Sequence, residues 1–297
     1  MCLPGRTLQN VNVQGRQPTW SRLPFRSSRT ERHSDEGHGL PGKDHSLPGK
    51  ARNAPASRYH SPMAELFLVR HAQAAFGTDD YDRLTELGHR QARWLGSYFR
   101  ERELQFDRVV CGTLRRHRET VEGIAAEGVA IASATLDDRL DEYDPERLVR
   151  AHLAALHGER GEPQAPPPLE PDGPRKDHFR LLRDALTAWT LGKVDPSAHR
   201  SFRDFQEGAY QAFERACLPP DAGSVERVLL VSSGGPISSI VAHHLGMPAS
   251  SFVALNLQVR NSGFCEIRFN DRGAHLVSFN NVPHLDTVER RRHITFS

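Results

Sequence analysis

The sequence of 297 residues is 37% hydrophobic and 26% charged, with 39 basic and 37 acidic side chains. This near balance argues against a strongly basic nucleic-acid-binding protein and against an acidic disordered chain. The longest uncharged, largely apolar run covers residues 228–242, which is shorter than the roughly 18 to 20 residues of a membrane-spanning helix. Four widely spaced cysteines form neither a metal-ligand pattern nor a disulfide framework. We therefore expect a mostly globular, soluble and cytoplasmic protein without a nucleic-acid or membrane partner.

Residues 1–62 differ in composition from the rest of the chain. They contain ten basic and four acidic residues and no isoleucine, and the tetrapeptide at 40–43 recurs at 47–50. This composition predicts a disordered, low-complexity leader. A targeting peptide is the less favoured alternative, because no amphipathic helical pattern or apolar stretch is present. Met63 directly precedes the first patterned strand and is a candidate start, so residues 63–297 are expected to form the working domain.

Strand and helix patterns alternate after residue 62. Short apolar runs predict strands at 65–70, 107–111, 129–134 and 227–231, and two later strands at 263–270 and 274–279. Helical spacing predicts helices that begin near Thr85, at 114–126 and at 236–245. The alternation indicates a layered α/β domain.

A helical insertion interrupts this alternation at about 143–225. Helical patterns cover 145–157, 178–191 and 202–218, and a proline- and glycine-rich loop is expected at 158–177.

Basic side chains lie at the end of one predicted strand and shortly after the next. The first strand ends in Arg70 and His71, and the second leads into a helix that starts with Arg115 and Arg116. Ligands of α/β sheets bind at the carboxyl ends of the strands. Cations are unfavourable at a helix N-terminus, so arginines in that position indicate a bound anion such as phosphate.

Two more strand ends carry groups that suit phosphate chemistry. The third strand leads to five carboxylates in residues 136–144, which more often mark a solvated loop, although one of them could act as an acid. The fourth strand runs into Ser233, Gly234, Gly235 and Pro236 at the start of a helix. Converging backbone amides at a helix N-terminus favour an anion.

Five segments resemble motifs of the histidine phosphatase superfamily, in its phosphoglycerate-mutase-like branch, and they occur in the order of the family. They are Val69–Ala72, Leu84–Ala92, Leu114–Thr120, Leu140–Glu142 and Ser233–Ile237. The resemblance covers about residues 65–285. It implies a three-layer α/β sandwich with a mostly parallel central sheet, helices on both faces and a helical cap.

The resemblance also implies roles for individual residues. His71 matches the nucleophile that forms a phosphohistidine, and Arg70 and Arg116 match the arginines that neutralise the transferred phosphoryl group. Glu142 matches the acid that protonates the leaving group and then activates water. The substrate-binding residues are expected to be Gln73, Ser233, Gly234, Gly235 and His284. No metal or other cofactor is implied.

The sequence departs from the family pattern at three positions. The family normally has a second histidine where this chain has Ser233, a glycine where it has Ala72, and often an asparagine at Gly77. Loss of one stabilising donor costs on the order of 10² to 10³ in rate. We considered His284 and His117 as replacement cations, and unchanged turnover in His284→Ala would contradict the role of His284.

These residues favour a metal-independent phosphatase that acts on a small phosphomonoester. A pseudophosphatase that binds a phosphorylated ligand or protein with little or no turnover is the alternative, because of Ser233. A phosphoglycerate mutase is less favoured, as is an interaction protein on the same fold. The expected partner is a small phosphorylated substrate, and a homodimer is compatible with the sequence.

Overall fold

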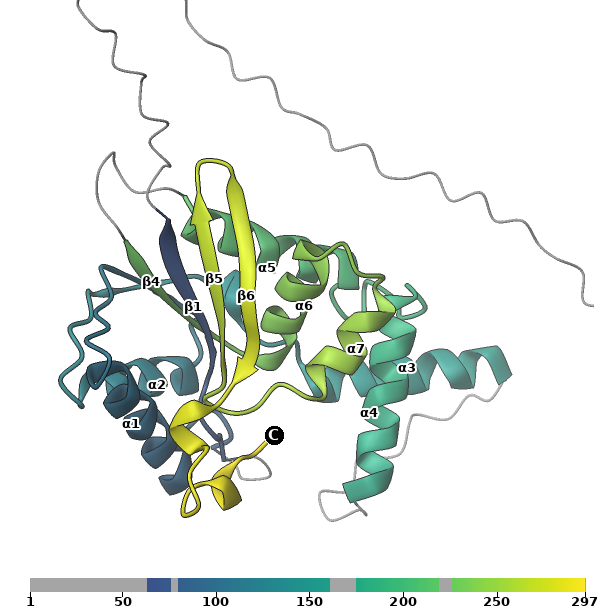
Figure 1. Ribbon diagram of the computed structural model, residues 1–297. Coiled ribbons are helices and arrows are strands. Elements are labelled where there is room, and N and C mark those ends of the chain that lie inside the picture. Colours follow the sequence, from purple (N-terminus) through teal and green to yellow (C-terminus); the bar gives the residue numbers. More distant parts are fainter. Residues whose placement is uncertain (1–62, 76–79, 161–174, 219–225, 297) are drawn as a thin grey trace, which may run out of the picture. The chain divides into compact units, whose positions relative to one another are not determined.

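The computed structural model describes residues 63–75, 80–160, 175–218 and 226–296 (Figure 1). All of them belong to one compact unit. The predicted leader at 1–62 and most of the predicted loop at 158–177 lie outside the described residues. The described ends of that predicted loop are helical, because helix α3 (Pro145–Arg160) extends to Arg160 and helix α4 (Arg175–Thr190) begins at Arg175.

The centre of the unit is one sheet with the strand order β3-β2-β4-β1-β5-β6. Its strands are β1 (Ala64–Arg70), β2 (Arg108–Cys111), β3 (Ala134–Leu136), β4 (Arg227–Ser232), β5 (Phe264–Asn270) and β6 (Gly273–Asn281). The first four are parallel, and β5 and β6 are added in antiparallel orientation. The mostly parallel sheet is therefore confirmed, and the carboxyl ends of β1, β2 and β4 meet at one edge.

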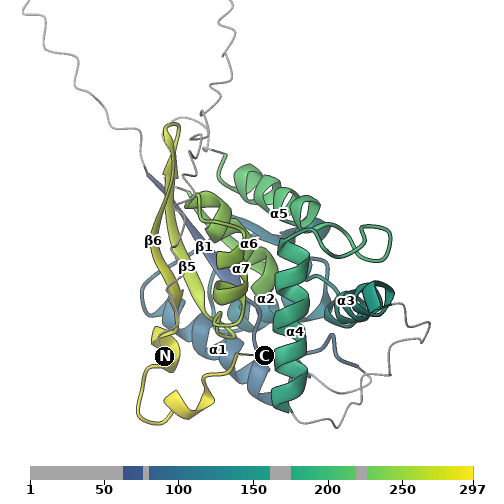
Figure 2. The same cartoon turned by 90° about the vertical axis from the view of Figure 1, so that its right-hand side faces the viewer.

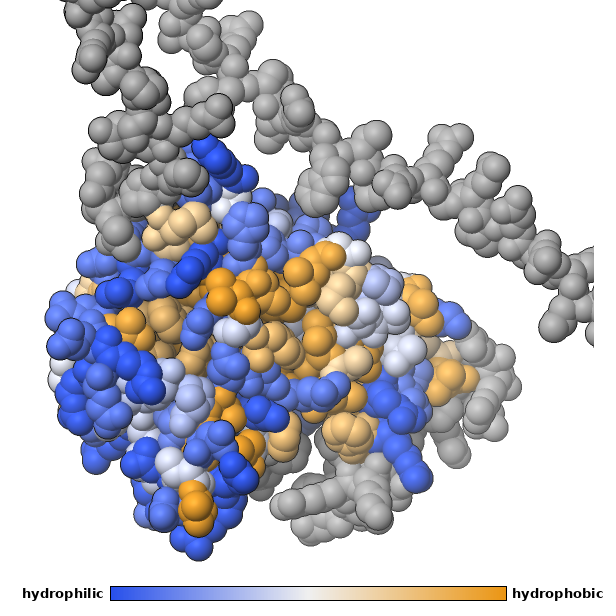
Figure 3. Space-filling model, in the orientation of Figure 1, coloured by the Kyte–Doolittle hydropathy of each residue, from blue (hydrophilic) through white to orange (hydrophobic). Residues whose placement is uncertain are grey.

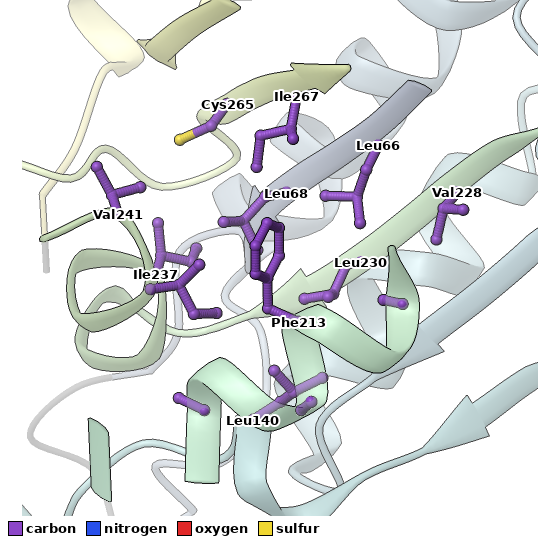
Figure 4. Close-up of a cluster of buried hydrophobic side chains, with 14 of the residues drawn as sticks. Leu66, Leu68, Leu140, Phe213, Val228, Leu230, Ile237, Val241, Cys265 and Ile267 are labelled. Carbon is purple, nitrogen blue, oxygen red and sulfur yellow. The ribbon is translucent and has the colours of Figure 1, made fainter. Parts of the chain in front are cut away.

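Side chains of the central strands alternate between two cores, because successive residues of a strand point to opposite faces. Leu66 and Leu68 of β1 pack with α5 (Phe202–Ala216) and α6 (Gly234–His244), as Figure 4 shows. Phe67 and Val69 face the other way, against α1 (Glu86–Arg100) and α2 (Arg115–Ala125). Helices thus cover both faces of the sheet, which makes the three-layer sandwich.

The start of α1 follows the predicted cap. Thr85 has extended backbone angles, and its hydroxyl accepts a hydrogen bond from the N–H of Gly88 at 2.9 Å. Such a cap satisfies one of the free amides in the first turn of the helix. The same hydroxyl lies 2.9 Å from Oε1 of Gln73, so the cap also ties α1 to the loop after β1.

A third hydrophobic cluster lies beside the sheet, where α3 (Pro145–Arg160), α4 (Arg175–Thr190), α5 and α7 (Ser250–Asn256) meet (Figures 1 and 2). Trp189 is its largest buried side chain and packs on Phe202, Phe205 and Phe252. Helices were expected in this region of the chain, but α7 was not, since its seven residues are too few to display a helical period.

The third strand lies further along the chain than predicted. The apolar run at 129–134 contributes only an isolated bridge between Ile131 and Phe106, and the strand is formed by 134–136. Its three residues are exposed at the edge of the sheet. An exposed edge strand carries little hydrophobic signal, which explains the error.

Hydrophobic residues also reach the surface. The view in Figure 3 shows them in the middle of a largely hydrophilic face, and exposed examples in the chain are Val277, Leu245 and Met247. None of the helices in the described part of the chain has the length and hydropathy that crossing a membrane requires.

Candidate active site

The basic side chains at the ends of β1 and β2 meet in one buried pocket. Arg70, His71 and Arg116 are all less than 9% exposed. Parallel pairing places Arg70 beside Ser232 at the end of β4, and the N–H of His71 donates to the carbonyl of Ser232 at 2.8 Å. The structure therefore brings together three strand ends that are far apart in the sequence.

His71 is held as a neutral imidazole with a defined free nitrogen. Its Nδ1 lies 2.7 Å from the carbonyl oxygen of Ala72, so Nδ1 carries the proton. Nε2 is then the acceptor, and Nε of Arg116 donates to it at 3.3 Å. Burial lowers the pKa of His71 well below its usual range, and Arg116 and Arg70 lower it further. A neutral imidazole whose lone pair is released from this hydrogen bond is a nucleophile.

Arg116 is fixed on several sides. Its NH1 donates to Asp82 at 2.8 Å, and its guanidinium lies 5.1 Å from the ring centroid of Tyr81. The backbone carbonyl of Arg116 accepts a hydrogen bond from Thr120, whose hydroxyl in turn accepts one from the N–H of Ala72. The start of α2 and the loop after β1 are thus joined around His71.

Arg70 is anchored from the opposite side. Its NH1 donates to the carbonyl of Val259 and to that of Phe296, the latter at 2.7 Å. Its Nε is buried without a partner among the described residues. A buried guanidinium nitrogen without an acceptor is unusual, and an oxygen of a bound phosphate would satisfy it.

Glu142 lies over the Gly-Gly turn. Both of its carboxylate oxygens accept a hydrogen bond from the N–H of Gly235, each at 3.1 Å. Burial raises the pKa of Glu142 above its usual value, although Gly235, Arg116 and Arg70 act in the opposite direction. The net shift is upward, which is the direction that a general acid needs.

Gly234 and Gly235 begin α6 directly after Ser233. The position of a Cβ on Gly234 would lie 3.6 Å from Cζ of Arg70, and a Cβ on Gly235 would overlap Oε1 of Glu142. The two glycines thus allow the helix N-terminus to lie between the guanidinium and the carboxyl group.

The structure places His117, rather than His284, against Ser233. Nε2 of His117 lies 2.7 Å from Oγ of Ser233, and both side chains are fully buried. His284 is also buried, but Nε2 of its ring pairs with the hydroxyl of Ser262 at 2.8 Å. The charged group that acts on the pKa of His284 is Arg290, not an arginine of the pocket.

Gln73 lies in the loop after His71, and its side chain is already engaged. Its Oε1 accepts the hydroxyl of Thr85, and its backbone N–H donates to the buried Gln91 at 2.9 Å. Its predicted contact with substrate remains a prediction.

Sequence reasoning missed the residues that hold the pocket in place. Asp82 and Tyr81 hold Arg116, and Asn256 donates to the hydroxyl of Tyr143 at 3.0 Å. Ser232 donates to the carbonyl of Leu140 at 2.6 Å and so ties β4 to the segment that carries Glu142. Asn256 belongs to a helix that was not predicted, whereas Ser232 could have been noticed as the last residue of a buried strand.

The fold and the pocket define an α/β protein with a buried histidine between two arginines, a carboxyl group and a helix N-terminus. The sequence model of the histidine phosphatase superfamily (branch 1) matches residues 66–167 and 171–282. The chain belongs to this superfamily.

Solved structures of low sequence identity match the chain, and the first two described here share its fold. Mycobacterial hydrolase 2 is 19% identical, with a TM-score of 0.52, and the match covers 78% of this chain and 97% of that protein. YhfR of Bacillus stearothermophilus is 18% identical, with a TM-score of 0.51 and coverage of 74% and 98%. A mycobacterial glucosyl-3-phosphoglycerate phosphatase is 20% identical, with a TM-score of 0.48 and coverage of 73% and 99%. No curated protein matches the chain significantly in sequence.

Proposed function

We propose that the chain is a phosphatase that hydrolyses a small phosphomonoester through a phosphohistidine on Nε2 of His71. The observation that carries this proposal is the pair of contacts to the imidazole of His71. The carbonyl of Ala72 holds the proton on Nδ1, and Nε of Arg116 points at the lone pair of Nε2. A phosphoryl oxygen that accepts the N–H of Arg116 in place of Nε2 would free this lone pair for attack and would lie against the guanidinium.

In the first step, the lone pair of Nε2 forms a bond to phosphorus while the bond from phosphorus to the ester oxygen breaks. Glu142 gives its proton to the departing alkoxide, so the alcohol leaves neutral. Arg70 and Arg116 offset the charge on the phosphoryl oxygens. The buried nitrogen of Arg70 supports this role, since it has no acceptor among the described residues.

In the second step, the Glu142 carboxylate takes a proton from water, whose oxygen attacks phosphorus. The bond from phosphorus to nitrogen breaks, which releases inorganic phosphate and restores neutral His71 and protonated Glu142. The charge compensation comes from arginines and backbone amides, so we propose that the reaction needs no metal. We also propose a cytoplasmic location, which agrees with the free thiols of Cys111, Cys217 and Cys265.

The test is release of p-nitrophenol from p-nitrophenyl phosphate in the presence of EDTA, with the intact chain and His71→Ala. We expect turnover that disappears in the variant, and an acid-labile phosphorylated protein after a rapid quench. The matched control is His89→Ala, which removes an exposed imidazole from α1 and should keep the rate.

Equal background rates in the intact chain and His71→Ala would contradict the proposal. Tight binding of inorganic phosphate with such a background would instead favour the pseudophosphatase alternative.

A further inference from the structure

A second buried histidine lies beside the nucleophile and has no part in the proposed reaction. The ring centroids of His71 and His117 are 5.6 Å apart. His117 and Ser233 are both fully buried, and the 2.7 Å contact between Nε2 and Oγ joins α2 to the start of α6. A buried ionisable group beside a reactive centre is a candidate for function.

The surroundings of His117 favour one of its tautomers. Nδ1 makes no hydrogen bond among the described residues, but Oδ1 of Asp141 lies 3.6 Å from it. A Cβ on Gly112 would overlap Nδ1, so only glycine allows this approach. Asp141 is itself held by the N–H of Thr113 at 2.6 Å. The negative charge of Asp141 on this side favours a proton on Nδ1 in the neutral ring as well as in the charged one.

This tautomer decides what Ser233 can offer to a ligand. When His117 is neutral, Nε2 is an acceptor and uses the hydroxyl proton of Ser233. When His117 is charged, Nε2 donates to Oγ, and the hydroxyl of Ser233 is free to donate elsewhere. The phosphoryl oxygens of a substrate are acceptors only, so they pair with Ser233 in the second state.

The charge of a bound anion would favour the charged state of His117. Burial and the neighbouring Arg116 lower the pKa of His117 to about 3, so the ring is neutral. The groups that face it are Arg116, His71, Asp141 and the backbone of Gly112. A phosphate dianion would add two negative charges beside the arginines and favour the imidazolium.

We propose that His117 takes up a proton when a phosphorylated ligand binds, and that Ser233 then donates its hydroxyl hydrogen to a phosphoryl oxygen. Ser233 is thus a further catalytic residue, and His117 and Asp141 are positioning residues that act through it. The inference rests on the proposed phosphoryl pocket, but it requires binding only and not turnover.

The test measures proton uptake when inorganic phosphate binds, by calorimetry in buffers of different ionisation enthalpy. The background is Glu142→Gln, which removes the other group expected to gain a proton. We expect this background protein to take up about one more proton per phosphate than the same protein with His117→Gln. Ser233→Ala should reduce the same uptake, because it removes the hydroxyl oxygen that accepts a hydrogen bond from the charged imidazole.

Two controls separate this effect from a structural one. His199→Gln removes another buried histidine whose pKa is lowered by burial, in the cap, and should leave the proton uptake unchanged. Ser238→Ala removes a fully buried hydroxyl of α6 without a partner among the described residues, and should leave it unchanged as well.

Kinetics provide an independent test if the chain turns over. Ser233→Ala and His117→Gln should each lower kcat on the order of 10²-fold, and the double variant should be no slower than the single ones. Additive losses would overturn the link between the two residues. An acid-stable phosphoserine at Ser233 would overturn its role as a donor.

Proton uptake that is equal with and without His117 would also overturn the inference. If uptake depends on His117 but no hydrolysis occurs, the inference holds and the proposed phosphatase activity fails. If hydrolysis proceeds through His71 with unchanged uptake in His117→Gln, the proposed function holds and the inference fails.

Discussion

The backbone N–H of Gly235 donates to both carboxylate oxygens of Glu142, at 3.1 Å each. This contact joins the start of α6 to a residue 93 positions earlier in the chain. It holds the proposed acid against the helix N-terminus without any charged partner in hydrogen-bond contact among the described residues. Glu142, the proposed acid, and the Gly-Gly turn are therefore parts of one structural unit.

A methyl group at Gly235 should disable the acid. In Gly235→Ala, the Cβ would overlap Oε1 of Glu142 and lie 2.8 Å from Cδ1 of Tyr143. Misplacement of a catalytic group by about 1 Å can cost on the order of 10²-fold in rate, so we expect a loss of that size in kcat/KM. Steady-state kinetics with p-nitrophenyl phosphate measure it.

Gly208→Ala is the matched control for this substitution. Gly208 lies inside α5, where the nearest atom to an added Cβ would be Cγ of Arg139 at 3.7 Å, an ordinary contact. Activity should stay unchanged, and the free energy of unfolding should rise by about 0.4–1 kcal/mol. Full activity in Gly235→Ala would show that Glu142 does not depend on this turn.

The proton on Glu142 should control the pH dependence of the reaction. Burial raises the pKa of this carboxyl and lowers that of His71. At low pH Glu142 is protonated and His71 is still neutral, so kcat/KM should be highest there and fall as pH rises through the pKa of Glu142. Glu142→Gln should remove this fall and slow an alkyl phosphate more than p-nitrophenyl phosphate, whose leaving group needs no proton.

The same shift has a consequence for stability. A carboxyl whose pKa is higher in the folded state binds more protons there than in the unfolded chain, so the free energy of unfolding decreases as pH rises from the unfolded pKa through the folded one. Glu142→Gln should therefore be more stable than the unchanged protein at neutral pH, and this gain should disappear in acid. Urea unfolding at several pH values measures it, and a gain that is independent of pH would contradict the interpretation.

The sequence predicted the frame of the site well, because the frame rests on strong local signals. The apolar run of β1, the cap at Thr85 and the glycines before α6 each have a simple physical pattern. The pattern of buried strands therefore predicts that Arg70, His71 and Ser233 lie at one edge of the sheet. Their catalytic roles remain proposals.

The contacts between these groups could not be predicted from the sequence. Nothing in the pattern of α2 indicates that Arg116 turns toward His71 while His117, the next residue, reaches Ser233. These directions depend on how α2 packs on β4 and on the bulky side chains around it. The sequence led to the hypothesis that His284 supplies the missing cation, with His117 as the other candidate, whereas the packing of α2 against the start of α6 places His117 beside Ser233.

Arg116 should be replaceable by lysine only at a high cost in rate. Its guanidinium donates through Nε to His71 and through NH1 to Asp82, and a lysine has one ammonium group for both. Because the planar fork is lost, we expect Arg116→Lys to lower kcat by about 10² to 10³. The control is Arg115→Lys, since the neighbouring Arg115 is exposed and pairs with Glu119 and Asp80. Equal rates for both variants would show that the guanidinium of Arg116 does not act on the transferred group.

His284 should make the fold sensitive to acid. Burial lowers its pKa to about 3 in the folded protein, whereas the ordinary value of 6.5 applies to the unfolded chain. As pH falls below 6.5, His284 takes up a proton in the unfolded chain but stays neutral in the folded protein. The contribution of neutral His284 to the free energy of unfolding is therefore lost progressively down to about pH 3. At about pH 5 this loss amounts to about 2 kcal/mol.

His284→Gln keeps a side chain that can form a hydrogen bond with Ser262 but cannot gain a proton, so the stability of this variant should depend less steeply on pH. Urea unfolding between neutral pH and pH 5 tests this, with exposed His89→Gln as the comparison. An unchanged slope would mean that a charged His284 is accommodated in the folded protein.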